Sequence, residues 1–188
     1  AVAVTGTKAL STDQVVAAAD INLGTPMLRV STSDIARRVA TLPRVSVADV
    51  SRGWPWTIRI EVTERTATAV LYAPDGVHLV DSTGFDFATV PTAPAGLPKL
   101  TLPAASPADA RTRAVETVLA ALPSQLRGQV ASIGADTPAS VRFQLTNGKA
   151  VMWGDATDSG RKAEVLAALL TRPGNVYDVS SPTLPTVS

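Results

Sequence analysis

The side chains with the most chemical potential lie close together in one stretch, with Asp75, Asp81 and Asp86 around His78, the single histidine of the chain. Carboxylates can bind a cation and an imidazole can act as a base, so a metal site is the first chemistry to consider. The spacing argues against it, because no HxH or HxxE pattern accompanies His78 and aspartate is common in turns and at strand ends. We therefore expect His78 to be a solvent-facing strand residue and predict no metal site.

The sequence contains no motif typical of nucleophilic catalysis. Serine and threonine are abundant, but no GxSxG motif is present and His78 is the one imidazole that could serve as a base. The glycines form neither a Walker A nor a GxGxxG pattern, and the absence of cysteine excludes disulfides and thiolate metal sites. We predict no catalytic residue and no cofactor. An α+β hydrolase stays open as an alternative, and it would need a pocket that holds a nucleophile and a base.

Composition indicates a folded protein without the charge of a nucleic-acid binder. The 188 residues are 45% hydrophobic and 18% charged, and 17 basic against 16 acidic residues give a net charge of +1 with no basic block. No apolar run approaches the roughly 18–20 residues that cross a bilayer, and no signal peptide is present. The chain begins with Ala-Val-Ala-Val and no initiator methionine. We expect a fragment or a processed form.

The first third of the sequence predicts a strand, two helices and two strands. A strand over Ala1–Gly6 precedes a capping box, in which the Ser11 hydroxyl and the Gln14 side chain each bond the other's backbone N–H. A second helix is predicted from Ser31 to Leu42. Its apolar positions fall on one helical face: Ile35, Val39 and Leu42.

Two strands and a tight connection are predicted between Leu42 and Arg65. Valines mark a short first strand with a phase break near Ala48, and Gly53 and Pro55 indicate a turn. The next strand alternates apolar and polar residues, and three of its side chains are expected on the exposed face: Arg59, Glu61 and Thr63. Of the two tryptophans in the connection, Trp54 is predicted to seal the end of the core, and Trp56 is more open to solvent.

These elements, in this order, resemble the POTRA domain of the FtsQ/DivIB family of bacterial cell-division proteins. The resemblance covers the whole segment and depends on several short motifs: Val4-x-Gly6, Leu10-Ser11, Gly24-x-Pro26-Met27-Leu28, Ile35, Leu42-Pro43-x-Val45, Ala48-x-Val50, Arg52-x-Trp54-Pro55 and Glu64-Arg65. One position departs from the pattern, because Ala67 stands where the family usually has proline.

Beyond Arg65 the sequence predicts mainly strands. A hairpin is predicted from strands 67–72 and 77–81 around the turn Ala73-Pro74-Asp75-Gly76, and another turn precedes 85–87. The proline-rich segment 90–105 is expected to cross the surface, with 100–102 briefly extended. Ser106 is predicted to cap a helix that buries four apolar side chains: Val115, Val118, Leu119 and Leu122.

The last third predicts a strand over 129–135, a hairpin of 141–146 and 149–154 around Asn147-Gly148, a helix and a final strand over 175–180. The motifs "L.NG..V.WG" and "V.DVS" resemble the β domain of the same family. We therefore predict an α+β protein in which a POTRA domain of β-α-α-β-β order (residues 1–66) precedes a mixed β-sheet domain with two or more packed helices (residues 67–188). The junction is predicted to be short and continuous strand.

An exposed sheet edge is the remaining candidate for function, because its unpaired N–H and C=O groups can accept another strand. The resemblance implies that the end of the β domain recruits an FtsB/DivIC-like division protein. The predicted partner-binding residues lie in and after the final strand: Val176, Tyr177, Asp178, Val179, Ser180, Ser181 and Leu184. Because proline cannot donate to a ladder, an augmented edge is expected to stop near Ser181. Alternatively, the strand closes the sheet and Pro182 and Pro185 protect it from pairing.

The resemblance implies a non-enzymatic scaffold of the divisome. Its partners would be FtsB/DivIC-like and FtsL-like proteins, and the edge of the strand that carries Arg59, Glu61 and Thr63 is a second, weaker candidate site. The full protein would be anchored in the cell membrane by a single N-terminal helix, with this region extracytoplasmic at the septum. A POTRA-containing chaperone-like module of polypeptide transport or outer-membrane assembly is the alternative.

Overall fold

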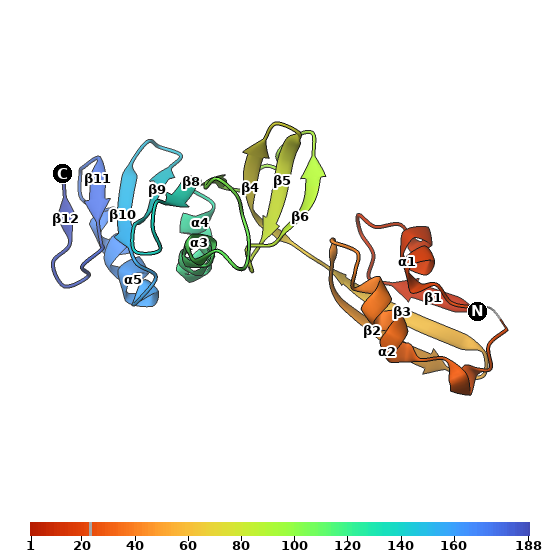
Figure 1. Cartoon of the computed structure of the whole chain (residues 1–188). Helices are drawn as coiled ribbons and strands as arrows, with labels where there is room; N and C mark the ends of the chain where they lie inside the picture. The colour runs from red at the N-terminus through yellow and green to blue at the C-terminus, as the bar shows by residue number, and fades with distance from the viewer. Residues whose placement is uncertain (23) are drawn as a thin grey trace. The chain divides into compact units, whose positions relative to one another are not determined.

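The computed structural model describes residues 1–22 and 24–188 and divides them into two compact units, residues 1–65 and residues 66–188 (Figure 1). Each unit has its own β-sheet and its own hydrophobic core. Within this described part of the chain, no helix has both the length and the apolar character that a membrane crossing requires. The fold is α+β, as the sequence predicts.

The first unit has the predicted order of elements, with one short addition. They are β1 (Val2–Thr5), α1 (Thr12–Ala19), the 3-10 helix η1 (Met27–Arg29), α2 (Thr32–Val39), β2 (Val45–Gly53) and β3 (Thr57–Glu64). The sheet order is β1-β3-β2, with β1 parallel and β2 antiparallel to β3. A register shift between Val45 and Val47 accounts for the phase break in β2, which the sequence places near Ala48.

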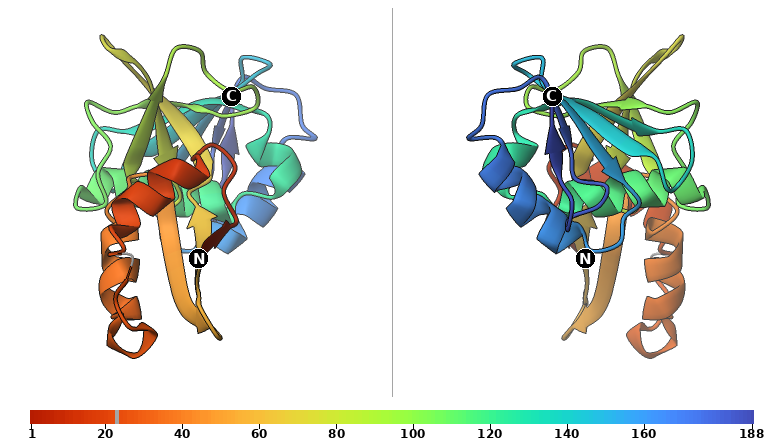
Figure 2. Two further views of the ribbon diagram at one scale, coloured as in Figure 1. Left: turned by 90° about the vertical axis from the view of Figure 1, so that its right-hand side faces the viewer. Right: turned by 90° about the vertical axis from the view of Figure 1, so that its left-hand side faces the viewer.

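Caps fix where the two helices of this unit begin. The predicted capping box is confirmed, since Ser11 accepts from the N–H of Gln14 and the Gln14 side chain accepts from the N–H of Ser11. The hydroxyl of Ser31 caps α2, which ends at Val39 rather than at the predicted Leu42. Both helices lie on one side of the orange strands (Figure 2). Their apolar faces bury Val15, Ala19, Ile35 and Val39 against Val45, Ile58, Ile60 and Val62.

The carboxylate of Glu64 holds the loop before α1 against the end of β3. Its oxygens accept hydrogen bonds from the backbone N–H groups of Lys8, Ala9 and Leu10 at 2.6–3.1 Å. Partial burial raises the pKa of Glu64, but the three N–H donors outweigh this effect and hold the pKa below its usual value. The Glu64 side chain therefore joins residues 8–10 to the end of β3, two segments that lie far apart in the sequence.

The second unit is built on a nine-stranded sheet in the order β12-β11-β10-β9-β8-β7-β4-β5-β6. Its elements are β4 (Ala67–Ala73), β5 (Gly76–Asp81), β6 (Asp86–Val90), β7 (Lys99–Thr101), α3 (Ala110–Ala121), α4 (Ser124–Arg127), β8 (Val130–Ala135), β9 (Val141–Leu145), β10 (Ala150–Gly154), α5 (Ser159–Leu169), β11 (Val176–Asp178) and β12 (Thr186–Val187). The predicted hairpins β4–β5 and β9–β10 are confirmed, and Gly148 takes the positive φ of 84° that its turn requires.

Helices α3 and α5 pack on one face of this sheet and form the larger core with it (Figure 1). Trp153 of β10 is fully buried there, and its indole N–H donates to the hydroxyl of Ser159. The buried Lys162 is compensated, since its ammonium donates to a carboxylate oxygen and to the carbonyl oxygen of Asp155, each at 2.9 Å. Helix α3 is capped by Asp109 rather than by the predicted Ser106.

The brief extended piece predicted at 100–102 is present as β7 (Lys99–Thr101), but the expectation that it crosses the surface is wrong. Strand β7 lies within the sheet, parallel to both β4 and β8, and Leu100 is buried. Its close approach to β8 requires a glycine, because a Cβ at Gly134 would lie 2.0 Å from the Thr101 hydroxyl oxygen. Strand β7 therefore connects β4–β6 to β8–β12.

The two tryptophans of the first unit are both exposed, as predicted for Trp56 but not for Trp54. Trp54 is 70% exposed and Trp56 74% exposed, so the prediction that Trp54 seals the core is wrong. Helices α1 and α2 close this small core instead, because their apolar faces already cover the inner side of the sheet. The tryptophans are left at the β2–β3 turn with no core to fill.

Candidate partner-binding edge

The C-terminal end of the nine-stranded sheet has one more strand than the sequence predicts. Strand β11 pairs in parallel with β10 on one side and antiparallel with β12 on the other. The prediction that residues 176–180 form the edge is therefore wrong, because β12 covers β11. After Pro185 the chain returns, and Val187 and Thr186 lie opposite Tyr177 and Asp178.

Hydrogen bonds identify which groups of β12 remain open. Ser188 donates its N–H to Val176 and accepts from the N–H of Val176, each at 2.9 Å, so these two residues form a hydrogen-bonded pair. In an antiparallel ladder such pairs alternate with pairs that are not hydrogen-bonded. Val187 is therefore in the alternate position, and its N–H and C=O point away from β11. No strand lies beyond β12 in the described sheet.

Two of the predicted partner-binding residues are buried inside the unit. Tyr177 has no exposed surface, and its hydroxyl donates to the carbonyl oxygen of Arg172 at 2.7 Å and accepts from the ammonium of Lys149 at 3.0 Å. Val179 is equally buried, and its N–H donates to the carbonyl oxygen of Met152. These side chains hold the end of the sheet together and do not face an incoming strand.

The remaining predicted residues lie at the surface around the β11–β12 connection. Val176 is 38% exposed and Leu184 78% exposed. The carboxylate of Asp178 accepts from the N–H and the hydroxyl of Ser180, which ends β11 in a tight turn. Ser180 and Ser181 are exposed on that turn. The structure thus brings Val176, Leu184 and the turn close to the edge strand, while the main-chain groups that could pair belong to β12.

The second predicted site is also placed differently. Arg59, Glu61 and Thr63 are exposed on the face of the sheet away from the helices, as the alternation predicts. The edge expected along their strand is absent, since β3 is the central strand and pairs with β1 and β2. On this face a shallow hollow of about 220 Å³ is lined in part by Arg59, Glu61 and Asp49. Any contact here would involve side chains rather than strand addition.

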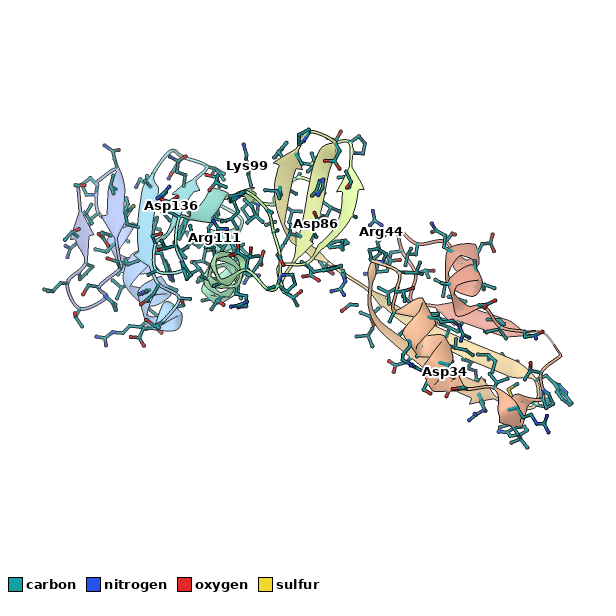
Figure 3. All side chains as sticks on the ribbon, in the orientation of Figure 1. Asp34, Arg44, Asp86, Lys99, Arg111 and Asp136 are labelled. Carbon is teal, nitrogen blue, oxygen red and sulfur yellow. The ribbon has the colours of Figure 1, made fainter. Side chains whose placement is uncertain are left out.

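His78 is held between two carboxylates. Its Nε2 lies 2.9 Å from an oxygen of Asp75, and its Nδ1 contacts Asp86, which is labelled in Figure 3. The bond to Asp86, and then that to Asp75, raises the pKa of the imidazole. The side chain is 19% exposed, so the expectation of a solvent-facing residue is wrong. Both ring nitrogens are engaged, which leaves none to act as a base.

Asp81 does not join this group. Its carboxylate accepts from the N–H and hydroxyl of Thr83 and from the N–H of Phe85, and so organises the β5–β6 turn. In the described part of the chain, no three histidine or acidic side chains are grouped so that they could hold a metal ion.

Glu116 of α3 is a buried acid whose position the sequence did not reveal. It is 4% exposed, one carboxyl oxygen accepts from the Thr68 hydroxyl at 2.9 Å, and the other has no hydrogen-bond partner. Burial, with a smaller contribution from the charge of Asp81, raises the pKa of Glu116 to about 7 despite the bond from Thr68.

Taken together, the two units define a class of protein: a POTRA-type domain of β-α-α-β-β order that precedes a helix-covered mixed sheet with an open terminal strand. Comparison with known families agrees with each half. The "POTRA domain, FtsQ-type" matches residues 1–65, and the "Cell division protein FtsQ/DivIB, C-terminal" domain matches residues 69–180.

Curated relatives extend the match over almost the whole chain. The chain is 45% identical over 186 residues to Cell division protein FtsQ of Mycobacterium leprae, which covers 99% of this chain and 54% of the relative. It is 46% identical to that of Mycolicibacterium smegmatis (99% and 56%) and 38% identical to that of Streptomyces bingchenggensis (100% and 74%). The chain belongs to the FtsQ/DivIB family of cell-division proteins. It spans about half the length of the mycobacterial relatives it matches.

The edge residues Thr186 and Val187 were missed by sequence reasoning. The strand they form is two residues long and follows Pro182 and Pro185, so it carries neither alternation nor a turn signal that could separate it from a loose tail. The β-branched pair Thr186-Val187 is the one weak indication in the sequence.

Proposed function

We propose that this chain acts as a non-enzymatic scaffold of the divisome, and that its nine-stranded sheet accepts a strand from an FtsB/DivIC-like partner at β12. One observation carries the proposal: β12 is the last strand of the sheet, and the outward N–H and C=O of Val187 are available for pairing. An added strand would gain main-chain hydrogen bonds there.

Side chains next to the edge would supply specificity. Leu184, two residues before β12, is 78% exposed, and Val176 on β11 is 38% exposed. A partner strand at β12 could cover both with alternate apolar side chains while its backbone pairs with Val187. Because Pro185 has no N–H, the main-chain contribution is short, and we infer that apolar contacts with Leu184 supply much of the affinity.

Other parts of the proposal come from the family. An FtsL-like protein would join the same assembly, and the exposed face with Arg59, Glu61 and Thr63 would contact further division proteins through side chains. The full-length protein would be anchored by one membrane helix, with this region on the extracytoplasmic side at the septum. The match to FtsQ-type domains favours this role over polypeptide transport.

Titration calorimetry against the extracytoplasmic segment of the FtsB/DivIC-like protein from the same organism tests the proposal. Val187→Pro removes the outward N–H but no inward bond, because Thr186 and Ser188 occupy the inward positions. We expect it to weaken binding about tenfold or more, from loss of a ladder bond and its geometry. Val187→Ala keeps the N–H and should retain most of the affinity.

Two results would count against strand addition at β12. The first is absence of binding by the parent chain. The second is equal binding by Val187→Pro and Val187→Ala, which would place the contact elsewhere. Circular dichroism establishes that both variants are folded.

A further inference from the structure

The end of the first unit that holds the β2–β3 turn has unusually exposed apolar side chains. Among the large apolar residues that the structure describes, four are at least 70% exposed: Leu28, Trp54, Trp56 and Leu184. Three of these four belong to this one end, on η1 and on the turn. We refer to Leu28, Trp54 and Trp56 as the apolar tip.

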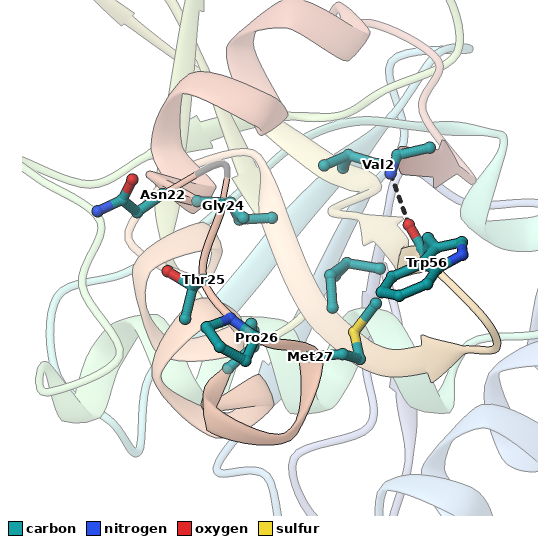
Figure 4. Close-up of a pocket in the computed structure, with 11 residues that line it drawn as sticks. Val2, Asn22, Gly24, Thr25, Pro26, Met27 and Trp56 are labelled. Carbon is teal, nitrogen blue, oxygen red and sulfur yellow. Dashed lines mark hydrogen bonds between the residues drawn. The ribbon is translucent and has the colours of Figure 1, made fainter.

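Hydrogen bonds tie the two segments of the apolar tip together. Arg52, at the end of β2, donates to the carbonyl oxygens of Met27 and Val30 and so fixes η1 beside the turn. Beside the tip, Trp56 and Met27 line a largely apolar hollow of about 290 Å³ together with Val2 and Pro26 (Figure 4). The tip is therefore a defined surface.

The two segments that form the apolar tip carry only positive charges. Residues 21–30 and 50–60 contain Arg29, Arg52 and Arg59 but no aspartate or glutamate, although the whole chain has 17 basic and 16 acidic residues. All three arginines are exposed. Four acids flank these segments: Asp20 and Asp34 line a hollow with Arg29, and Asp49 and Glu61 line one with Arg59, whereas Arg52 lines neither hollow. A surface that fits this tip is therefore apolar beneath a layer of negative charge.

We propose that the apolar tip inserts into the interface of a phospholipid bilayer that contains anionic lipids. Indole rings are favoured at the headgroup level, where the ring meets acyl chains and its N–H meets water. Leu28 adds apolar area, and the arginines lie at the height of the lipid phosphates, which attract basic side chains. The contact would orient the first unit on the membrane and lies outside the strand-addition site.

Tryptophan emission gives a direct test because the emission of the third tryptophan should not respond to lipid. Trp153 is fully buried in the second unit, so a blue shift on adding vesicles reports Trp54 and Trp56. We expect the full chain to shift and to co-sediment with vesicles of equal parts phosphatidylglycerol and phosphatidylcholine. Binding should be weaker to pure phosphatidylcholine and in high salt, since the arginine contribution is screened.

Matched variants locate the contact. The double change Trp54→Ser with Trp56→Ser should lower partition onto anionic vesicles about tenfold or more, from the lost apolar transfer. Leu28→Ser should lower it more than Leu184→Ser, since both leucines are 78% exposed and only Leu28 lies in the tip. Arg29→Gln should cost about fivefold. Arg37→Gln, whose side chain is 79% exposed on α2, should cost little.

Three outcomes would overturn the proposal. They are no binding of the parent to anionic vesicles, equal partition of the double tryptophan variant, and equal effects of Leu28→Ser and Leu184→Ser. Sedimentation velocity without lipid tests the alternative that the tip binds a second copy of the chain. A dimer that is lost in the double tryptophan variant would assign the tip to that contact. Circular dichroism confirms folding of each variant.

Discussion

Two glutamates, one in each unit, have pKa values shifted in opposite directions by their surroundings. Glu64 receives three backbone N–H donors from residues 8–10, and its pKa lies below its usual value. Glu116 is 4% exposed with one hydroxyl donor, and burial raises its pKa to about 7. Both residues are the same acid, so the number of donors and the degree of burial decide whether charge is favoured.

The difference gives the two carboxylates opposite contributions to stability as the pH changes. Glu64 stabilises the first unit above its unfolded pKa near 4.5, and this contribution is lost as the pH falls. Glu116 retains a proton in the folded state between pH 4.5 and about 7 that the unfolded chain releases. The contribution of Glu116 to the stability of the second unit therefore decreases as the pH rises through that window.

The largest expected effect comes from removing the favourable carboxylate. Glu64→Ala should destabilise the first unit by about 2–3 kcal/mol at neutral pH, because three N–H groups lose a charged acceptor. Amide hydrogen exchange of β1, β2 and β3 measures this loss within the full chain. Glu61→Ala, exposed on the same strand, is the control. Equal exchange in the two variants would show that Glu64 does not stabilise the first unit.

The second prediction is that removal of a carboxylate stabilises the protein. Glu116→Gln should stabilise the second unit by about 1–3 kcal/mol near pH 8 and change little near pH 5, because glutamine resembles the protonated acid. Urea unfolding followed by the emission of buried Trp153 measures it. Glu164→Gln, exposed on α5, should leave stability unchanged at both values. A variant less stable than the parent near pH 8 would show that the fold favours the carboxylate of Glu116, which would contradict the raised pKa.

The smallest expected effect comes from His78, whose ion pairs also make stability depend on pH. His78 has a raised pKa, so its stabilisation is complete below its unfolded pKa near 6.5 and is lost as the pH rises through the folded value. His78→Gln should cost about 1 kcal/mol near pH 5.5 and little near pH 9. Asp86→Asn should cost more than Asp75→Asn, because Asp86 is 31% exposed and Asp75 68%. The same urea assay applies, and a pH-independent loss would contradict the ion pair.

Local rules account for most of the fold. The capping box at Ser11 and the turn at Asn147-Gly148 depend on residues near in sequence, and both were predictable. Strand β7 was not recognised as part of the sheet, because a three-residue parallel strand among prolines has no periodicity of its own. Its position is set by β4 and β8, which lie far from it in the sequence.

The candidate site was less predictable than the fold. A terminal strand could be inferred from position, but whether Val176–Asp178 or Thr186–Val187 lies outermost depends on how the chain returns after Pro185. Burial of Glu116 was equally hidden, because it adjoins the predicted buried Val115 on α3 and has the composition of a solvated position. Exposure of Trp54 depends on how completely two helices fill a small core, which no local pattern records.

The short strand β7 also has a mechanical consequence. A pull applied at β12 across the sheet would be carried from strand to strand by backbone hydrogen bonds. Between β8 and β9 the register has five paired positions, whereas β4 and β7 share the single position Val70–Lys99. Under tension, the nine-stranded sheet should therefore separate first between β4 and β7. This seam limits the load that the sheet can transmit.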